Sequence, residues 1–328
     1  MNIRLALSSL FLISASASAQ TLVMGTIQAP ESPLTKAAEY FADQVANYSN
    51  NEIKIKVINS GQLGPVLEQY QNMQIGSQDL FIEDIGWNAQ YVKGYGALSV
   101  PFVISSPEGL KSFLDSDVGV AWKKELASKH NIMTLNDKLI RSPRVVFSRE
   151  KISSVDGFQK IKFRVPEIDV YFKSWKEIGV NPTPVPWSEL YLALRQGVVD
   201  GGEGPFTTLV ASKFPETAKY VYETNHLYSS NSITMTNSKF SQMSDKDKEI
   251  LLLAASDTEA YFSELIASKE DKDRNVMLNE YGVKFEKLAS TDRQKMINLV
   301  ANAAKKIEQQ GAWESGLFEK MVQSQESK

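Results

Sequence analysis

The order of strand-like and helix-like patterns in the first hundred residues limits the fold more than any other feature of the chain. An apolar run at 21–25 precedes a helical pattern that begins near Pro33, and alternating apolar residues at 53–57 precede a second helical pattern at 66–75. A third apolar run follows at 80–82. Strands that alternate with helices in this way favour parallel pairing, with the helices on the faces of the sheet. Such sheets bind ligands outside the carboxyl ends of their strands.

The same alternation begins again in the second half of the chain. Strand patterns and helical patterns follow one another at 132–135, 144–147, 161–165, 168–178 and 188–196. After Met243 the strand patterns become sparse, and long helical patterns rich in Ala, Leu, Lys and Glu take their place. A chain of 328 residues also exceeds the roughly 250 to 300 residues at which one hydrophobic core stops growing. We therefore expect two α/β lobes braced by the last helices.

The first residues have the pattern of a secretory signal peptide. Arg4 is followed by an almost uncharged apolar stretch at 5–16, and Ala17-Ser18-Ala19 ends it with the small residues of a cleavage site. We expect residues 1–19 to be removed and the exported, soluble protein to begin near Gln20. No later segment reaches about 18 consecutive uncharged apolar residues, so we expect no membrane-spanning helix.

Composition argues against several classes of function. The 36 Lys and Arg residues and the 39 Asp and Glu residues are interspersed, so the chain lacks the basic surface of a nucleic-acid-binding protein. There are no cysteines, which excludes disulfides and thiolate sites. His130 and His226 are the two histidines, neither is followed by another at metal-ligand spacing, and the usual hydrolase, nucleotide and zinc motifs are missing. We expect no enzymatic activity, no metal and no cofactor.

The arginines carry the strongest indication of a binding site. Arg164 ends an alternating apolar run just before Pro166, which places it at the carboxyl end of a strand and beside a crevice. Arg144 has a similar setting at the start of an apolar run. Two guanidinium groups that converge in a dry cleft can hold a carboxylate through charge-assisted hydrogen bonds. The alternative is that Arg164 is exposed, or forms an internal ion pair with a nearby acidic residue, namely Glu167, Asp169 or Glu189.

Two stretches make the interpretation more specific. They are Phe163-Arg-Val-Pro166 and residues 179–205, which read GVNPTPVPWSELYLALRQGVVDGGEGP. Together with Gly61-Gln-Leu-Gly64 and Val100-Pro-Phe-Val103, they resemble the solute-binding proteins of tripartite ATP-independent periplasmic (TRAP) transporters, the DctP-like family. The resemblance extends over nearly the whole of the exported chain.

The resemblance implies a two-lobed periplasmic binding protein of the class II-like type. Each lobe would be a mostly parallel sheet flanked by helices, and a long helix would bridge the lobes. We expect lobe I to comprise residues 20–142 and about 230–270, and lobe II residues 143–229 and about 271–328. Such a protein is periplasmic, closes by a hinge motion over a small organic acid and delivers it to the membrane permease subunits of the transporter. We expect it to act as a monomer.

The resemblance also assigns roles to individual residues. Arg164 matches the family arginine that binds the ligand carboxylate, and Arg144 lies at the spacing of an assisting arginine, with Arg141 open as the alternative. The family's frequent Gln-Glu-Asn-Pro is replaced by Gly202-Glu203-Gly204-Pro205, so an asparagine that often contacts ligand is missing. The glycines then either make room for a larger ligand and let Glu203 approach it, or serve only a turn.

The first lobe is expected to complete the site with acceptors and a flat ring. The residues expected to face the arginines are Gln28, Glu31, Glu83, Asp84 and Trp87, and Trp187 is expected to flank the ligand from the second lobe. Carboxylates repel a second acid group but accept hydrogen bonds from hydroxyl groups, which favours a hydroxylated monocarboxylate such as a sugar acid. One alternative is that a Lys or Arg neutralises Glu83 or Asp84. Another is that the two tryptophans flank an aromatic or aliphatic acid.

Two other classes of function remain as alternatives. One is the binding protein of another importer class, such as an ATP-driven importer, with a dicarboxylate or keto acid as ligand. The other is an exported, metal-assisted enzyme that uses Asp200 and Glu203.

Overall fold

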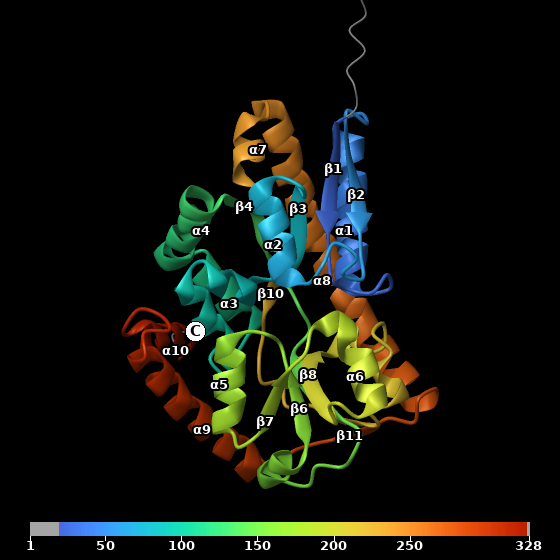
Figure 1. The fold of residues 1–328 in the computed structure, drawn as a ribbon, viewed down its shortest axis with the longest axis vertical. Helices are drawn as coiled ribbons and strands as arrows, with labels where there is room; N and C mark the ends of the chain where they lie inside the picture. The colour runs from blue at the N-terminus through green and yellow to red at the C-terminus, as the bar shows by residue number, and fades with distance from the viewer. Residues whose placement is uncertain (1–19, 327–328) are drawn as a thin grey trace, which may run out of the picture.

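The computed structural model describes residues 20–326 and contains two mixed sheets flanked by helices (Figure 1). The predicted signal peptide, residues 1–19, lies outside the described residues. Within the described part of the chain, no helix combines the length and apolarity needed to cross a membrane.

The first sheet has the strand order β2-β1-β3-β10-β4. Its strands are β1 (Gln20–Gly25), β2 (Ile53–Ile58), β3 (Leu80–Asp84), β4 (Ile132–Ile140) and β10 (Ser230–Thr236). Strand β1 pairs in parallel with β2 and β3, whereas β10 is antiparallel to both β3 and β4. The strand expected at 132–135 is part of β4. It is the edge strand of the first sheet and not the first strand of the second, because β10, from the second half of the chain, pairs with it.

The second sheet has the strand order β11-β9-β5-β8-β6-β7. Its strands are β5 (Arg144–Ser148), β6 (Lys162–Val165), β7 (Asn181–Pro184), β8 (Gly201–Pro205), β9 (Tyr220–Tyr222) and β11 (Lys284–Glu286). Strand β6 is parallel to β7 and β8, and β5 is antiparallel to β8 and β9. The carboxyl ends of β6 and β7 therefore lie at one edge of this sheet, which faces the first sheet across the site described below.

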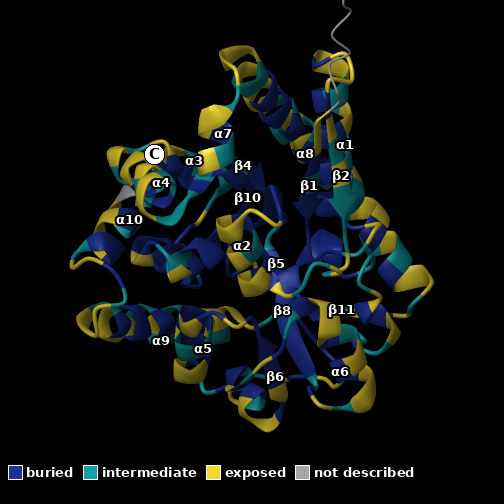
Figure 2. Cartoon of the chain, turned by 45° about the horizontal axis from the view of Figure 1, so that its top comes forward, coloured by how far each residue is buried: buried dark blue, intermediate teal, exposed yellow. Residues whose placement is uncertain are grey.

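Helices cover both sheets. They are α1 (Pro33–Tyr48), α2 (Val66–Ile75), α3 (Pro107–Leu114), α4 (Asp117–His130), α5 (Asp169–Glu177), α6 (Leu190–Gln196), α7 (Asn237–Gln242), α8 (Asp245–Asn279), α9 (Ser290–Gln309) and α10 (Leu317–Glu326). Short 3-10 turns include η1 (Ile85–Gln90), η2 (Lys93–Ser99) and η4 (Trp187–Glu189). The central strands of both sheets are buried, whereas the edge strands β2, β7 and β11 are mostly intermediate or exposed, as are the outward faces of the helices (Figure 2).

The alternation of side chains along β3 explains how the first sheet is packed on both faces. Leu80 and Ile82 belong to a core shared with α1 and the first half of α8, whereas Phe81 points to the other face and packs with Tyr70 of α2. This second core continues into the second sheet.

Helix α8 and two chain crossings connect the sheets. The helix has 35 residues, about 52 Å at 1.5 Å per residue, and begins with Ser244, whose hydroxyl accepts from the backbone N–H of Asp247. It buries Phe262 in the first core and Met277 in the second. The crossings are residues 141–143 and 223–229, and they are hydrogen-bonded to each other, because the backbone N–H of Arg141 donates to the carbonyl of Ser229.

Candidate ligand-binding cleft

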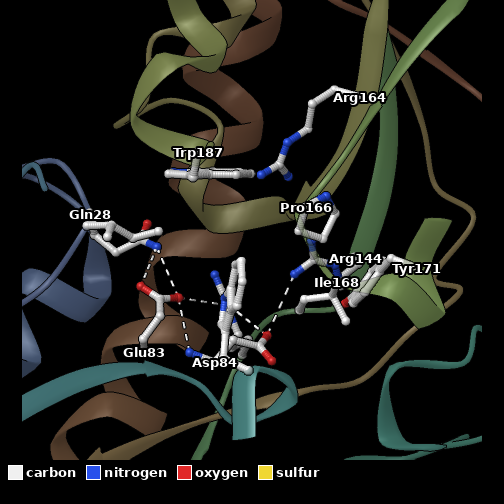
Figure 3. Close-up of a pocket in the computed structure, with 12 residues that line it drawn as sticks. Gln28, Glu83, Asp84, Arg144, Arg164, Pro166, Ile168, Tyr171 and Trp187 are labelled. Carbon is white, nitrogen blue, oxygen red and sulfur yellow. Dashed lines mark hydrogen bonds and ion pairs between the residues drawn. The ribbon is translucent and has the colours of Figure 1, made fainter. Parts of the chain in front are cut away.

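A polar cavity lies between the carboxyl ends of strands from both sheets. Its volume is about 370 Å³ when the solvent space at its mouth is counted. We call it the inner cavity (Figure 3). Its lining residues come from the ends of β1, β3 and β6, from the start of β5, from η1, η4 and α5, and from one chain crossing: Ile27, Gln28, Glu83, Asp84, Trp87, Arg141, Arg144, Arg164, Pro166, Ile168, Tyr171 and Trp187.

Arg164 differs from the other two arginines of the inner cavity because it has no acidic partner. It projects from β6, is 2 % exposed, and its Nε donates to the carbonyl of Val185 at 2.8 Å. Its guanidinium carbon lies 5.4 Å from the ring centroid of Trp187 (Figure 3). Among the described residues, no Asp or Glu side chain is within ion-pair distance of it, so the internal pairs considered with Glu167, Asp169 and Glu189 do not form.

The electrostatics of Arg164 reflect this isolation. Burial lowers its pKa to about 10, the charge of Glu203 opposes this shift, and the like charge of Arg144 adds to it. A guanidinium group remains charged in proteins under ordinary conditions. The lowered pKa therefore means that the site holds a positive charge that the surrounding protein only partly compensates.

Arg144 lines the inner cavity but does not present a free guanidinium group to it. Its Nε and Nη2 donate to the two carboxylate oxygens of Glu203 at 2.5 and 2.7 Å, and its remaining Nη1 lies 3.8 Å from Asp84. Burial disfavours its charge, but Glu203 outweighs that effect and raises the pKa of Arg144. The expected convergence of Arg144 and Arg164 on one ligand group is thus replaced by a bidentate ion pair inside the second sheet.

Glu203 lies behind Arg144 and not at the wall of the inner cavity. It is completely buried on β8, and Oε2 also accepts from Nε2 of His226 at 3.2 Å. Burial lowers the pKa of His226, so the ring is neutral, with the hydroxyl of Thr224 donating to Nδ1 at 2.7 Å. Burial also disfavours the Glu203 carboxylate, but the charge and hydrogen bonds of Arg144 and the bond from His226 lower its pKa. Glu203 was expected to approach the ligand; in this structure its oxygens accept from Arg144, and it is not among the residues that line the inner cavity.

Asp84 and Arg141 form a second ion pair on the opposite wall. Nη1 of Arg141 donates to Oδ2 of Asp84 at 2.9 Å, and the other oxygen of Asp84 accepts from the backbone N–H of Gly86 at 2.8 Å. The second of these bonds caps the start of η1. Arg141, the open alternative to Arg144, is therefore also paired, and it neutralises Asp84.

Gln28 and Glu83 supply acceptors to the inner cavity. Nε2 of Gln28 donates to the two oxygens of Glu83 at 3.1 and 3.4 Å, and the backbone N–H of Asp84 donates to Oε1 of Glu83 at 3.0 Å. Burial raises the pKa of Glu83, although Arg141 and Gln28 oppose the shift. Oε1 of Gln28 is buried and has no hydrogen-bond partner in the described structure.

The aromatic rings come from both sides, as expected for Trp87 and Trp187. The Trp187 ring packs edge to face on Phe214, with centroids 4.9 Å apart. A Cβ atom at Gly204 would lie 2.7 Å from Cη2 of Trp187, so this glycine makes room for the tryptophan. The space left by the missing side chain at 204 is therefore filled by the protein's own ring, and Gly204 serves close packing.

Two placements differ from those expected. Glu31 lies outside the inner cavity, where its side chain is 78 % exposed and pairs with Lys36 at 3.4 Å. Tyr171 of α5 lines the inner cavity, packs on the guanidinium group of Arg144 and was not anticipated. A signal for it existed, because α5 begins directly after the strand that carries Arg164 and its first turn must therefore lie at the same edge of the sheet.

Comparison with known proteins identifies the family. The sequence profile described as "Bacterial extracellular solute-binding protein, family 7" (DctP) matches residues 24–310. The chain is 31% identical over 242 residues to the sialic acid-binding periplasmic protein SiaP of Vibrio cholerae, covering 73% of this chain and 75% of the relative. It is 24% identical over 260 residues to the 2,3-diketo-L-gulonate-binding periplasmic protein YiaO of Escherichia coli, covering 79% of each.

Solved structures show the same fold. The sugar acid binding protein DctPAm of Advenella mimigardefordensis, in complex with galactonate, superposes with a TM-score of 0.87 at 25% identity, over 94% of this chain and 98% of the other. A TRAP periplasmic solute binding protein of Roseobacter denitrificans with bound L-galactonate gives a TM-score of 0.83 at 24% identity, over 94% and 99% of the two chains. This chain belongs to the bacterial extracellular solute-binding protein family 7, the DctP family of TRAP transporters.

Proposed function

We propose that this protein captures a hydroxylated monocarboxylate, a sugar acid, in the inner cavity and delivers it to the membrane permease subunits of a TRAP transporter. The observation that carries the proposal is the buried guanidinium group of Arg164, which lies in the inner cavity and has no carboxylate partner among the described residues. The carboxylate of the ligand is the group that would complete it.

The energetic argument starts from the cost of a buried charge. A charge taken out of water without a partner is strongly unfavourable, and an anion that supplies both charge and acceptors removes most of that cost. Each charge-assisted hydrogen bond to a carboxylate contributes about 1.5 to 3 kcal/mol. Trp187 supports the geometry, because its ring lies against the guanidinium group, whose carbon is 5.4 Å from the ring centroid.

The other pairs favour an acid with a single carboxylate. Arg141 and Arg144 are already paired with Asp84 and Glu203, so a second carboxylate on the ligand would find no uncompensated arginine. The wall opposite Arg164 instead offers acceptors, including the unpartnered Oε1 of Gln28. Ligand hydroxyl groups satisfy such acceptors when both are buried. The sugar acids named with the similar structures, galactonate among them, have this chemistry.

The biological setting of the proposal follows the family. The protein acts in the periplasm after loss of residues 1–19, as a monomer, and carries out no chemical reaction on its ligand. Lobe I consists of residues 20–142 and about 230–270, and lobe II of residues 143–229 and about 271–328. The crossings at 141–143 and 223–229 serve as the hinge on which the lobes close over the acid.

Calorimetric titration tests the proposal. The purified protein is titrated with sugar acids, dicarboxylates and keto acids, and a sugar acid is expected to bind most tightly. Arg164→Ala is expected to weaken that binding by well over about tenfold, the factor set by 1.4 kcal/mol, whereas Arg149→Ala, at an exposed arginine, leaves it unchanged. Binding of succinate without any hydroxy acid would overturn the ligand class. Unchanged affinity in Arg164→Ala would overturn the site.

A further inference from the structure

A second cavity adjoins the inner cavity, and we call it the outer cavity. It holds about 1050 Å³ of space and opens to solvent past exposed residues such as Pro30, Glu31 and Lys213. The inner cavity is the smaller of the two. Two residues line both, Ile27 after β1 and Trp187 in η4.

These two side chains form the partition between the cavities. Trp187 is 9 % exposed and Ile27 is 6 % exposed, although the outer cavity beside them is open. One comes from the first sheet and the other from the segment after β7 in the second sheet. The partition is therefore complete only when the two halves of the molecule lie together as in this structure.

The position of the Trp187 ring is fixed by its neighbours. Phe214 packs edge to face against it, the Arg164 guanidinium group lies over it, and Gly204 leaves room for its outer edge. A methyl group at 204 would meet Cη2 and Cζ3 of the ring at 2.7 and 2.9 Å. The ring is thus held where it closes the inner cavity on the side next to Arg164.

The far side of the partition is suited to a hydroxylated chain. Ser60, Ser188 and Tyr191 bring hydroxyl groups to the outer cavity. The hydroxyl of Ser60 donates to Oδ1 of Asn59 at 3.0 Å, and the hydroxyl of Tyr191 donates to the carboxylate of Glu216. Their oxygens can still accept hydrogen bonds from the hydroxyl groups of a tail that passed the partition.

We propose that Trp187 sets the maximum length of the bound acid. This inference rests on the proposed function. A short sugar acid such as galactonate, with its carboxylate on Arg164, would lie on the inner side of the ring, and the ring would cover it. A longer acid such as sialic acid needs the space that the ring occupies, so that its tail reaches the outer cavity. The intact protein therefore selects the shorter acid, although a relative that is 31% identical is named for sialic acid.

Titration of Trp187→Ala and the intact protein with galactonate and sialic acid tests the length limit. The ratio of the dissociation constant for sialic acid to that for galactonate is expected to fall by about tenfold or more in the variant, a change of 1.4 kcal/mol. An unchanged ratio, with galactonate still bound, would overturn the length limit alone. Failure of both acids and of every other sugar acid to bind the intact protein would refute the proposed function and the length limit with it.

A second variant separates the role of the ring from its contribution to folding. Gly204→Ala displaces the ring without removing it. When Trp187 is present, this substitution is expected to weaken galactonate binding, and when Trp187 is already replaced by alanine it is expected to have no such effect. The interaction free energy between the two sites measures this coupling. Additive effects of the two substitutions would contradict the partition. Trp187→Phe, which keeps a ring against Phe214, replaces Trp187→Ala if the alanine variant does not fold by circular dichroism.

Discussion

Replacement of Arg164 by methionine is expected to stabilise the ligand-free protein while it abolishes ligand binding. The side chain is completely buried, has one hydrogen bond, to the carbonyl of Val185, and has no ion pair in the described structure. Exchange of buried charged groups for apolar ones of similar volume is neutral or stabilising by about 1 to 4 kcal/mol. The lost hydrogen bond costs about 1 kcal/mol, and a methionine sulfur on Trp187 replaces part of the contact with the guanidinium group.

The net gain is then between about zero and 3 kcal/mol, which corresponds to a rise in Tm of up to roughly 12 °C at the 2 to 4 °C per kcal/mol of larger domains. Thermal unfolding is measured on protein that has been unfolded, dialysed and refolded to remove any ligand, and again with an excess of the best-bound acid. The intact protein gains Tm from the acid by mass action, and Arg164→Met does not. Arg149→Met, at an exposed position, controls for the loss of one positive charge. A lower Tm for ligand-free Arg164→Met, together with a retained ligand shift, would refute the reasoning.

Three further predictions concern the supporting structure. Glu203→Gln leaves the buried Arg144 without its counter-ion and is expected to cost about 3 to 5 kcal/mol in urea unfolding; a cost below about 1 kcal/mol would contradict the ion pair. Because the pKa of Glu203 is lowered in the folded protein, its contribution to stability is complete above the usual value of 4.5 and is lost as the pH falls below it, so the acid limb of a stability-pH curve becomes flatter in Glu203→Gln. Gly201→Ala places a Cβ 2.4 Å from the carbonyl oxygen of Phe147 and is expected to lower the free energy of unfolding by about 1 to 3 kcal/mol in the same assay. An unchanged free energy of unfolding would contradict this prediction and would mean that β8 shifts to accept the methyl group.

The local pattern was sufficient to predict where Arg164 lies. An alternating apolar run that stops at a proline ends a strand, and strand ends of this fold meet at a crevice, so the residue lines the inner cavity. Helix α2 was equally predictable over Val66–Ile75, because its apolar spacing is regular and Gly76, in the left-handed conformation, ends it.

The partners of the other arginines were not predictable from local patterns. Arg144 and Glu203 are separated by 59 positions and meet only through the antiparallel register of β5 and β8. Strand β10 was missed for a related reason. Five of the seven residues of its sequence, SNSITMT, are polar, yet all seven are buried, because groups such as the Thr234 hydroxyl donate to backbone carbonyls of neighbouring strands. Only the assembled sheets reveal which polar side chains are satisfied inside.

The positions of the ion pairs have a consequence for opening and closing. Arg141 forms an ion pair with Asp84 of the first sheet, and Arg144, three residues later, forms one with Glu203 of the second. Each ion pair would therefore stay intact if the two halves of the molecule moved apart. In the described cleft, the Arg144–Asp84 approach of 3.8 Å joins arginine and acid across the two halves, and it is long. Among the described residues, ion pairs therefore contribute little to holding the two halves together. That role falls to the apolar core that both sheets share and, in the proposed function, to the bound acid.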